Sequence, residues 1–398
     1  MTEPSLYPFE GDTRLDLDAR YAKLRADEPV SRVRMPNGEE AWLVTRYADI
    51  KAVLTDGRFH RSLVDGQDMT VATRGLVGME RSATLPMTDP PGHTEIRRLV
   101  VKAFTARRIE GLRDHTQVIV DGLLDNMKEA GSPADLVRHL ALPLPISVIA
   151  ELLGIPQPDH GRVRAWVDAL LSVIDLPAER IQEAKTEFET YMTDVVAQRR
   201  NNPGDDLISD LLRVREQDDK LTEDELLSLV MLLFVAGYET TVSQLSNFAY
   251  TLLTHPNLWS ELQDDTALLP QAIEELIRFV PLGFAGLPVR AVEDVRFHDV
   301  LIRAGDFVLL PKSSGNRDEL VFERPDEIDF HRGRNLHLGS GHGAHYCLGA
   351  QLARMEIQTA IGALLRRFPG LKLAAPEDAL QWRQGALVRG PRVLPIVW

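Results

Sequence analysis

Residues Gly339–Gly349 read GSGHGAHYCLG, and Cys347 within them is the only cysteine of the 398-residue chain. The glycines leave the backbone free to approach a flat or bulky group closely. The run AQLARMEIQTAIGALLRRF follows directly and has helical spacing of apolar residues. A thiol just before a helix is favoured as a thiolate by the helix dipole. A lone thiol is more often a small buried hydrophobe, so the rest of the chain must decide.

Three functional interpretations of Cys347 compete with that of a buried cysteine without a function. It is a nucleophile with His345 as its base, or a zinc ligand together with His342 and His345, or the thiolate ligand of a haem iron. Residues two apart in a tight loop rarely reach nucleophile–base geometry. Three zinc ligands within six residues lack the usual second pair. Neither of these two interpretations explains the other distinctive segments of the chain.

The composition is that of a globular protein, with 44% hydrophobic and 26% charged residues. A single cysteine forbids an internal disulfide, which fits a reducing cytoplasm. The start MTEPSLYPFEGDTRLD lacks the pattern of a signal peptide, and the longest apolar run is too short for a membrane span. The net charge of −14 argues against nucleic acid. We therefore expect a cytoplasmic protein that binds neither membrane nor nucleic acid.

Helical patterns dominate, and the absence of repeats and linkers predicts one domain over residues 1–398. Thr222 and Glu225 form a capping-box signature before LLSLVMLLFVAGYETTVSQLSNFAYTLLTHP, whose first half is apolar on all sides. This predicts a buried central helix that ends near Pro256, and a second helix is expected from about Leu348 to Phe368. Strand patterns are few: AWLVT, VRFHDVLI, DFVLL and RVLPIVW. The expected fold is mainly α with small β-sheets.

One acidic residue, Glu239, stands beside Thr240 inside the apolar helix, where an acid is costly unless it is paired or functional. Glu275 and Arg278 are three residues apart and share a helix face. His93 and Arg97, after Pro90-Pro91, are four apart and also share a face. The alternative without a catalytic role is that the Thr240 hydroxyl only donates to a backbone carbonyl of its own helix. For the two spaced pairs, the alternative is an ordinary pair on a helix surface.

Together these segments resemble the cytochrome P-450 superfamily. SGHGAHYCLGAQLAR is similar to the cysteine-ligand loop of the family. Three other segments resemble further motifs of the family and occur in the expected order along the chain: DPPGHTEIRR, AGYETT and ELIR. The resemblance implies the P-450 fold, with haem between the long central helix and the cysteine-loop helix. It implies that Cys347 is the axial ligand of the iron in haem b, and that Glu239 and Thr240 deliver protons to dioxygen. It implies haem-carboxylate contacts from His93, Arg97, Arg290 and His337.

Two positions depart from the family pattern. Ser340 stands where the family usually has a phenylalanine that shields the thiolate. Glu327 stands where an arginine often completes the ion pair of Glu275 and Arg278, so we assign Arg332 as the third partner.

The resemblance implies a monooxygenase that inserts one oxygen atom into its substrate by hydroxylation or epoxidation. The chain has no flavin-type glycine loop, so electrons from NAD(P)H are expected through a ferredoxin and its reductase. The docking surface is expected at a basic island, for which a solvated helix face is the alternative; it comprises Arg97, Arg98, Lys102, Arg107 and Arg108.

The likeness is greatest to actinobacterial oxidases that tailor macrolides and other natural products for antibiotic biosynthesis, so a bulky macrolide or polyketide substrate is expected. The alternatives are C–C or C–N coupling of an aromatic or cyclic-dipeptide substrate and, in a different class, a zinc hydrolase. A monomer is expected. The irregular stretch between Gly57 and Gly92, with its methionines, is expected to adapt to an apolar ligand. The expected pocket residues are Val235, Ala236, Leu282, Phe284, Leu387 and Val388.

Overall fold

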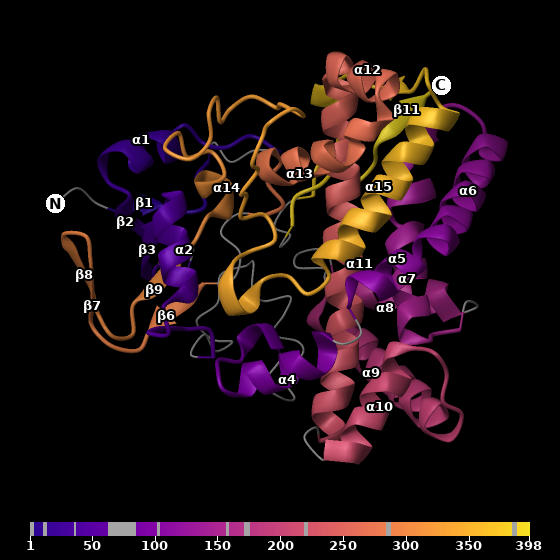
Figure 1. Cartoon of the computed structure of the whole chain (residues 1–398), viewed down its shortest axis with the longest axis horizontal. Helices are drawn as coiled ribbons and strands as arrows, with labels where there is room; N and C mark the ends of the chain where they lie inside the picture. The colour runs from indigo at the N-terminus through magenta and orange to yellow at the C-terminus, as the bar shows by residue number, and fades with distance from the viewer. Residues whose placement is uncertain are drawn as a thin grey trace. The chain divides into compact units, whose positions relative to one another are not determined.

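The computed structural model of the chain (Figure 1) describes residues 4–10, 14–35, 37–62, 85–101, 104–156, 159–170, 176–218, 222–283, 288–383 and 388–398. Two units make up the chain, each assembled from stretches that are distant in sequence. Unit 1 contains Met1–Arg74, Asp265–Cys347 and Leu387–Gly390, and unit 2 contains Gly75–Asp264, Leu348–Ala386 and Pro391–Trp398. The single domain over residues 1–398 stays a prediction.

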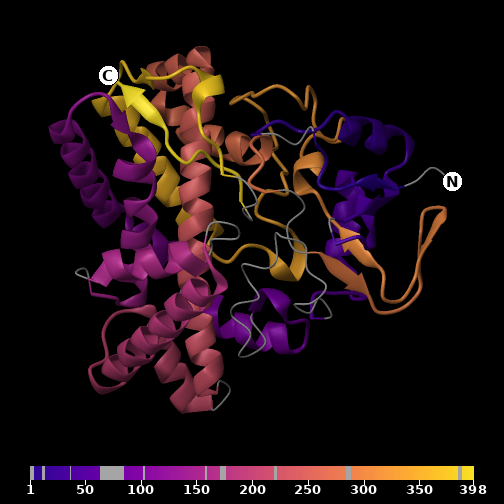
Figure 2. The ribbon, with the colours of Figure 1, turned by 180° about the vertical axis from the view of Figure 1, so that it is seen from behind.

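Unit 1 is built on a six-stranded sheet with the order β1-β2-β3-β9-β6-β4. The strands β2 and β3 pair antiparallel, from Val30 opposite Val44 to Arg34 opposite Glu40, and β9 joins β3 in parallel. The hairpin of β7 and β8 extends away from this sheet (Figures 1 and 2). The elements of unit 1 are β1 Ser5–Leu6, α1 Arg20–Asp27, β2 Val30–Arg34, β3 Glu40–Val44, α2 Tyr47–Thr55, β4 Phe59–His60, η4 Thr266–Leu268, α13 Leu269–Phe279, β6 Val289–Ala291, β7 Val295–Phe297, β8 Val300–Ile302, β9 Phe307–Leu309, α14 Lys312–Gly315 and η5 Gly343–His345.

The core of unit 1 forms where the sheet meets α2. Its members include Val44 and Val308 from the strands and Ile50 from the helix, none of which is exposed. Leu338 belongs to the same cluster although it lies in an irregular stretch. Burial of such a side chain is worth about 1.5–3 kcal/mol. The chain that leads to Cys347 is therefore anchored in the core of unit 1.

Unit 2 is helical apart from a small sheet of order β10-β11-β5. Its elements are η1 Leu85–Met87, α4 Gly92–Val101, α5 Ala106–Gly111, α6 Arg113–Ala130, β5 Ala134–Asp135, η2 Val137–Ala141, α7 Pro143–Leu153, α8 His160–Leu170, α9 Ala178–Asn201, α10 Leu207–Asp218, α11 Glu223–Thr254, α12 Pro256–Asp264, α15 Ala350–Arg367, β10 Lys372–Leu373, η6 Glu377–Ala379 and β11 Pro395–Val397. The expectation of a mainly α protein with small sheets is confirmed, as are the strands expected in AWLVT, DFVLL and the tail.

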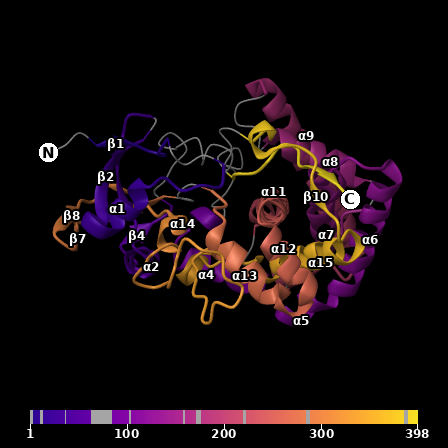
Figure 3. The same cartoon turned by 90° about the horizontal axis from the view of Figure 1, so that it is seen from above.

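The helix α11 is the centre of unit 2, and Figure 3 views it nearly end-on with α7, α9 and α15 beside it. The capping box of Thr222 and Glu225 is present at its start, and the helix ends two residues before Pro256. Among the described residues it is the one helix long and apolar enough to cross a membrane, but 67% of its most apolar stretch is buried inside the protein. That burial is typical of the core helix of a soluble protein.

Candidate functional site

Two glycines of the loop before Cys347 have backbone conformations that favour glycine. Gly341 and Gly343 have φ values of +81° and +72°, a region that residues with a side chain rarely adopt. A Cβ atom on Gly343 would also lie 2.8 Å from the carbonyl oxygen of Leu54. The Cys347 amide donates to the Ser340 carbonyl at 2.8 Å, which closes the loop. The loop thereby holds one exposed thiol on unit 1.

The donor set at this loop suits a haem iron better than a zinc ion. A haem iron would take one protein ligand from this loop, and the exposed thiol of Cys347 would provide it. His342, His345 and Cys347 are all described, yet no group of three metal-ligating side chains occurs among the described residues. The zinc hypothesis therefore has no support from the geometry.

A lysine adds positive charge near the thiol. Lys312, at the start of α14, is half-buried, and burial together with Arg61 lowers its pKa to about 8, whereas the charge of Cys347 acts to raise that pKa. A neighbouring lysine favours the thiolate over the thiol. The sequence motifs gave no indication of Lys312, because 35 positions separate it from Cys347 in the chain.

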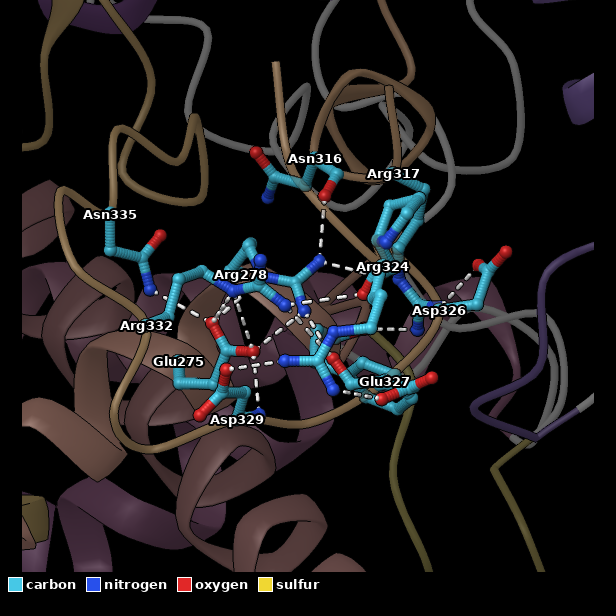
Figure 4. Close-up of polar contacts among 12 residues, drawn as sticks. Glu275, Arg278, Asn316, Arg317, Arg324, Asp326, Glu327, Asp329, Arg332 and Asn335 are labelled. Carbon is cyan, nitrogen blue, oxygen red and sulfur yellow. Dashed lines mark hydrogen bonds and ion pairs between the residues drawn. The ribbon is translucent and has the colours of Figure 1, made fainter. Parts of the chain in front are cut away.

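The carboxylate of Glu275 is the centre of a buried ionic network in unit 1 (Figure 4). Arg278 donates to both of its oxygens, at 2.7 and 2.8 Å, and neither side chain is more than 1% exposed. Arg332 reaches the same carboxylate at 3.0 Å. The amide of Asp329 and the side chain of Asn335 each donate to it at 3.0 Å. The structure thus brings together the three residues that the sequence grouped, and it adds Asn335.

Glu327 contributes to this network through its backbone. Its carbonyl oxygen accepts from Arg278 at 2.8 Å and from Arg332 at 3.2 Å, while its side chain pairs with Arg324 at 2.8 Å. Arg278 also donates to the carbonyl oxygens of Asn316 and Pro325, at 2.9 and 2.7 Å. The guanidinium is thereby saturated with acceptors, as a buried cation requires.

His337 contacts two groups of unit 1. Its Nε2 atom is 3.0 Å from a Glu274 carboxylate oxygen, and its Nδ1 atom accepts from the Gly339 amide at 3.2 Å. The haem-carboxylate contact expected of His337 stays a prediction. Arg290 lies on β6, where its guanidinium stacks at 4.1 Å over the ring of Phe307.

In unit 2, His93 and Arg97 lie one helical turn apart on α4, as their spacing predicted. His93 is 1% exposed and Arg97 is half-buried. They present an imidazole and a guanidinium from one face, and both groups bind carboxylates by charge-assisted hydrogen bonds.

Glu239 and Thr240 lie in the middle of α11, which is helical without a break from Glu223 to Thr254. The Thr240 hydroxyl donates to the Ala236 carbonyl at 2.7 Å, so its hydrogen is used within the helix. Its oxygen keeps acceptor capacity. An ion pair joins Glu239 to Arg383, and their side chains are 14% and 20% exposed. Sequence reasoning missed Arg383, because no spacing rule connects residues 144 positions apart.

Part of the expected pocket can be located. The Arg389 amide donates to the Leu282 carbonyl at 2.7 Å, which places Val388 beside Leu282 in unit 1. On α11, Val235 is buried and Ala236 is exposed. Several residues singled out in the sequence lie outside the described residues: Met69, Met79, Lys102, Phe284 and Leu387.

The basic island is partly neutralised. Arg108 pairs with Asp210 and lies 3.9 Å from Asp205. Arg98 and Arg107 are exposed. Among the described residues of the basic island, Arg98 and Arg107 therefore carry the most solvent-accessible positive charges.

An exposed thiol on a glycine loop suits the thiolate ligand of a haem iron, and this is the site expected of a haem-thiolate oxidoreductase. The chain belongs to the cytochrome P450 family, whose model matches residues 19–393. It is therefore a haem-dependent monooxygenase, and the resemblance found in the sequence is confirmed.

Three similar proteins illustrate the relationship. The chain is 50% identical to mycinamicin IV hydroxylase/epoxidase of Micromonospora griseorubida, over 100% of this chain and 99% of that protein. It is 47% identical to nocardicin C N-oxygenase of Nocardia uniformis subsp. tsuyamanensis, with the same coverage. The solved structure of the mixed-function P450 MycG matches with a TM-score of 0.92 and 48% identity, over 100% of both chains.

We predict that Glu275→Gln lowers the free energy of unfolding by about 3–5 kcal/mol, because two guanidinium groups then remain without a buried counter-charge. Glu183→Gln is the matched control: Glu183 and Arg180 have the same three-residue spacing but are 58% and 70% exposed. That exposed pair is worth about 0–1 kcal/mol. Urea unfolding curves measure both variants, and equal losses would contradict the assignment of Glu275 as a structural centre.

Proposed function

We propose that this monooxygenase oxidises a macrolide or a similarly bulky polyketide, by hydroxylation or epoxidation, in the biosynthesis of an antibiotic. The observation that carries the proposal is the 50% identity over the whole chain to a protein named for oxidising mycinamicin IV. In unit 1, the neighbouring apolar side chains of Leu282 and Val388 suit an apolar ligand.

The residues of the site divide into three roles. Cys347 binds the iron through its thiolate, with Lys312 supporting the negative charge. His93, Arg97, Arg290 and His337 hold the haem carboxylates. Haem, when bound, supplies the activation of dioxygen. Glu239 and Thr240 hold and pass the protons that this activation consumes: the carboxyl group carries the proton and the Thr240 oxygen accepts a hydrogen bond.

Oxidative coupling is a second candidate. The structure of cytochrome P450mel 107F1, described as having biaryl coupling reactivity, matches with 43% identity and a TM-score of 0.89 over 97% of each chain. The products separate the two activities by mass. Oxygenation adds one oxygen atom, whereas coupling joins two carbon or nitrogen atoms and removes two hydrogen atoms.

We further propose that a ferredoxin and its reductase deliver electrons from NAD(P)H to a monomeric enzyme in the cytoplasm. The exposed Arg98 and Arg107 support a basic docking surface for an acidic ferredoxin.

We predict that the purified enzyme, given a panel of macrolides that includes mycinamicin IV and a surrogate ferredoxin system, yields a product one oxygen atom heavier. We also predict that Thr240→Ala lowers the formation of this product by about 10²-fold or more. Thr251→Ala is the matched control, because Thr251 makes the same backbone hydrogen bond on α11, to the Asn247 carbonyl at 2.8 Å. Mass spectrometry measures the product. An equal loss of product formation in the two variants would contradict the proposal. So would a coupled product, whose mass is that of the substrates less two hydrogen atoms.

We predict that Arg98→Glu raises the apparent KM for ferredoxin several-fold and that added salt reduces the difference. Arg180→Glu on α9 is the control, since it reverses an exposed arginine outside the basic island. Steady-state reduction assays measure both. A KM that is the same for the Arg98 variant and the wild type would exclude this docking surface.

A further inference from the structure

Arg389 is a buried arginine in a short stretch of the C-terminal tail, Leu387–Gly390, that belongs to unit 1. It is 6% exposed, and an arginine is rarely buried this far without acceptors that fix its guanidinium. Its amide donates to the Leu282 carbonyl, and Val388 before it is buried as well. Leu282 and Val388 are the neighbouring residues of the expected pocket in unit 1. The Arg389 side chain therefore starts from a wall of that pocket.

The guanidinium of Arg389 contacts the opposite end of the chain. Its Nη1 atom donates to the Asp16 carbonyl at 2.9 Å and to the Arg14 carbonyl at 3.3 Å. Both acceptors are backbone oxygens, so the contact fixes the path of the chain whatever side chains it carries. Residues 14–17 are named here the N-terminal strap. The strap thus lies within the length of one arginine side chain from the pocket wall.

The backbone of the strap has an unusual conformation where Arg389 contacts it. Arg14 has a φ value of +47°, in the left-handed region that a residue with a side chain seldom adopts. Such a conformation persists where the surrounding structure holds it, and it is found most often at ligand-binding and active sites. Leu15 and Leu17 are half-buried, whereas Asp16 between them is exposed. The strap therefore contributes two apolar side chains close to Arg389.

The chain on each side of the strap is fixed on unit 1. After it, the Asp18 carboxylate accepts from the Arg20 amide at 2.8 Å and from the Arg20 guanidinium at 2.7 Å. That guanidinium also stacks over the ring of Phe9, 4.3 Å from its centroid. Before the strap, β1 pairs with β2. The strap is a short span between these anchors, and Arg389 holds it beside Leu282 and Val388.

We propose that Arg389 is a positioning residue for substrate selection: it holds the N-terminal strap against the wall formed by Leu282 and Val388, and the strap contacts the bulky substrate. The inference rests on the proposed macrolide activity and adds residues 14–17 to the segments that determine specificity. A wall that is ordered before binding favours a large apolar ligand, because little order has to be gained on binding. A small ligand that needs only the haem iron gains nothing from it.

The test compares two ligands of the holoenzyme by the shift of the Soret band: imidazole, which binds the iron directly, and the macrolide of the assay panel that the wild type binds most tightly. Arg389→Met is expected to raise the Kd of the macrolide by about tenfold, since binding must then order the strap, and to leave the Kd of imidazole unchanged. Arg389→Lys keeps a cationic donor for the Asp16 carbonyl and is expected to restore much of the difference. Arg46→Met is the matched control, because Arg46 donates to the carbonyls of Arg25 and Ala26, at 2.6 and 3.2 Å, outside the strap.

Hydrogen exchange of the unmutated protein gives a second measurement, which does not depend on how a variant folds. The bound macrolide is expected to slow exchange at the amides of residues 14–17 and to leave the hairpin of β7 and β8 unchanged.

The same ratio of the two Kd values in the wild type and in the Arg389→Met variant would overturn the inference, as would strap amides whose exchange the macrolide does not slow. Both outcomes differ from a failure of the proposed function. In that case no macrolide of the panel binds the wild type, and the role of the strap falls with it.

Discussion

The buried carboxylate of Glu275 organises the irregular chain that leads to the only thiol. It accepts hydrogen bonds from two guanidinium groups, one backbone amide and Asn335, so that almost no capacity is left unused. Arg278 also donates a hydrogen bond to the Asn316 carbonyl, and the Asn316 side chain accepts one from the Leu338 amide at 2.6 Å. The Leu338 carbonyl then accepts from Gly341, and the Ser340 carbonyl from Cys347. A chain without regular secondary structure is thereby held in one conformation up to the sulfur.

In unit 2 the constraint is a charged side chain within an apolar helix. α11 is buried along most of its length, and some of its hydroxyls, such as those of Thr240 and Thr251, donate to carbonyls one turn earlier. A carboxylate has no such local solution. Glu239 finds its partner in a chain segment near the C-terminus, which connects the proton-carrying position to a part of the protein that the sequence did not associate with it.

Sequence reasoning was most effective where a residue type and a short spacing carry the physics. The glycines before Cys347, the capping box at Thr222 and the pairing of Glu275 with Arg278 are of this kind. It failed where the partner lies far away in the chain: Arg383 at Glu239, Lys312 near Cys347 and Glu274 at His337 depend on tertiary packing that no local pattern encodes.

The central claim is that the thiolate of Cys347 binds the haem iron, and the carbon monoxide difference spectrum of the reduced, purified protein tests it most directly. A thiolate ligand donates electron density to the iron. We predict a strongly red-shifted Soret band, of the kind that thiolate-ligated haem gives, despite Ser340 at the usual phenylalanine position. A Soret band at the position of histidine- or thiol-ligated haem would contradict it, as would protein without haem absorbance from haem-replete cells.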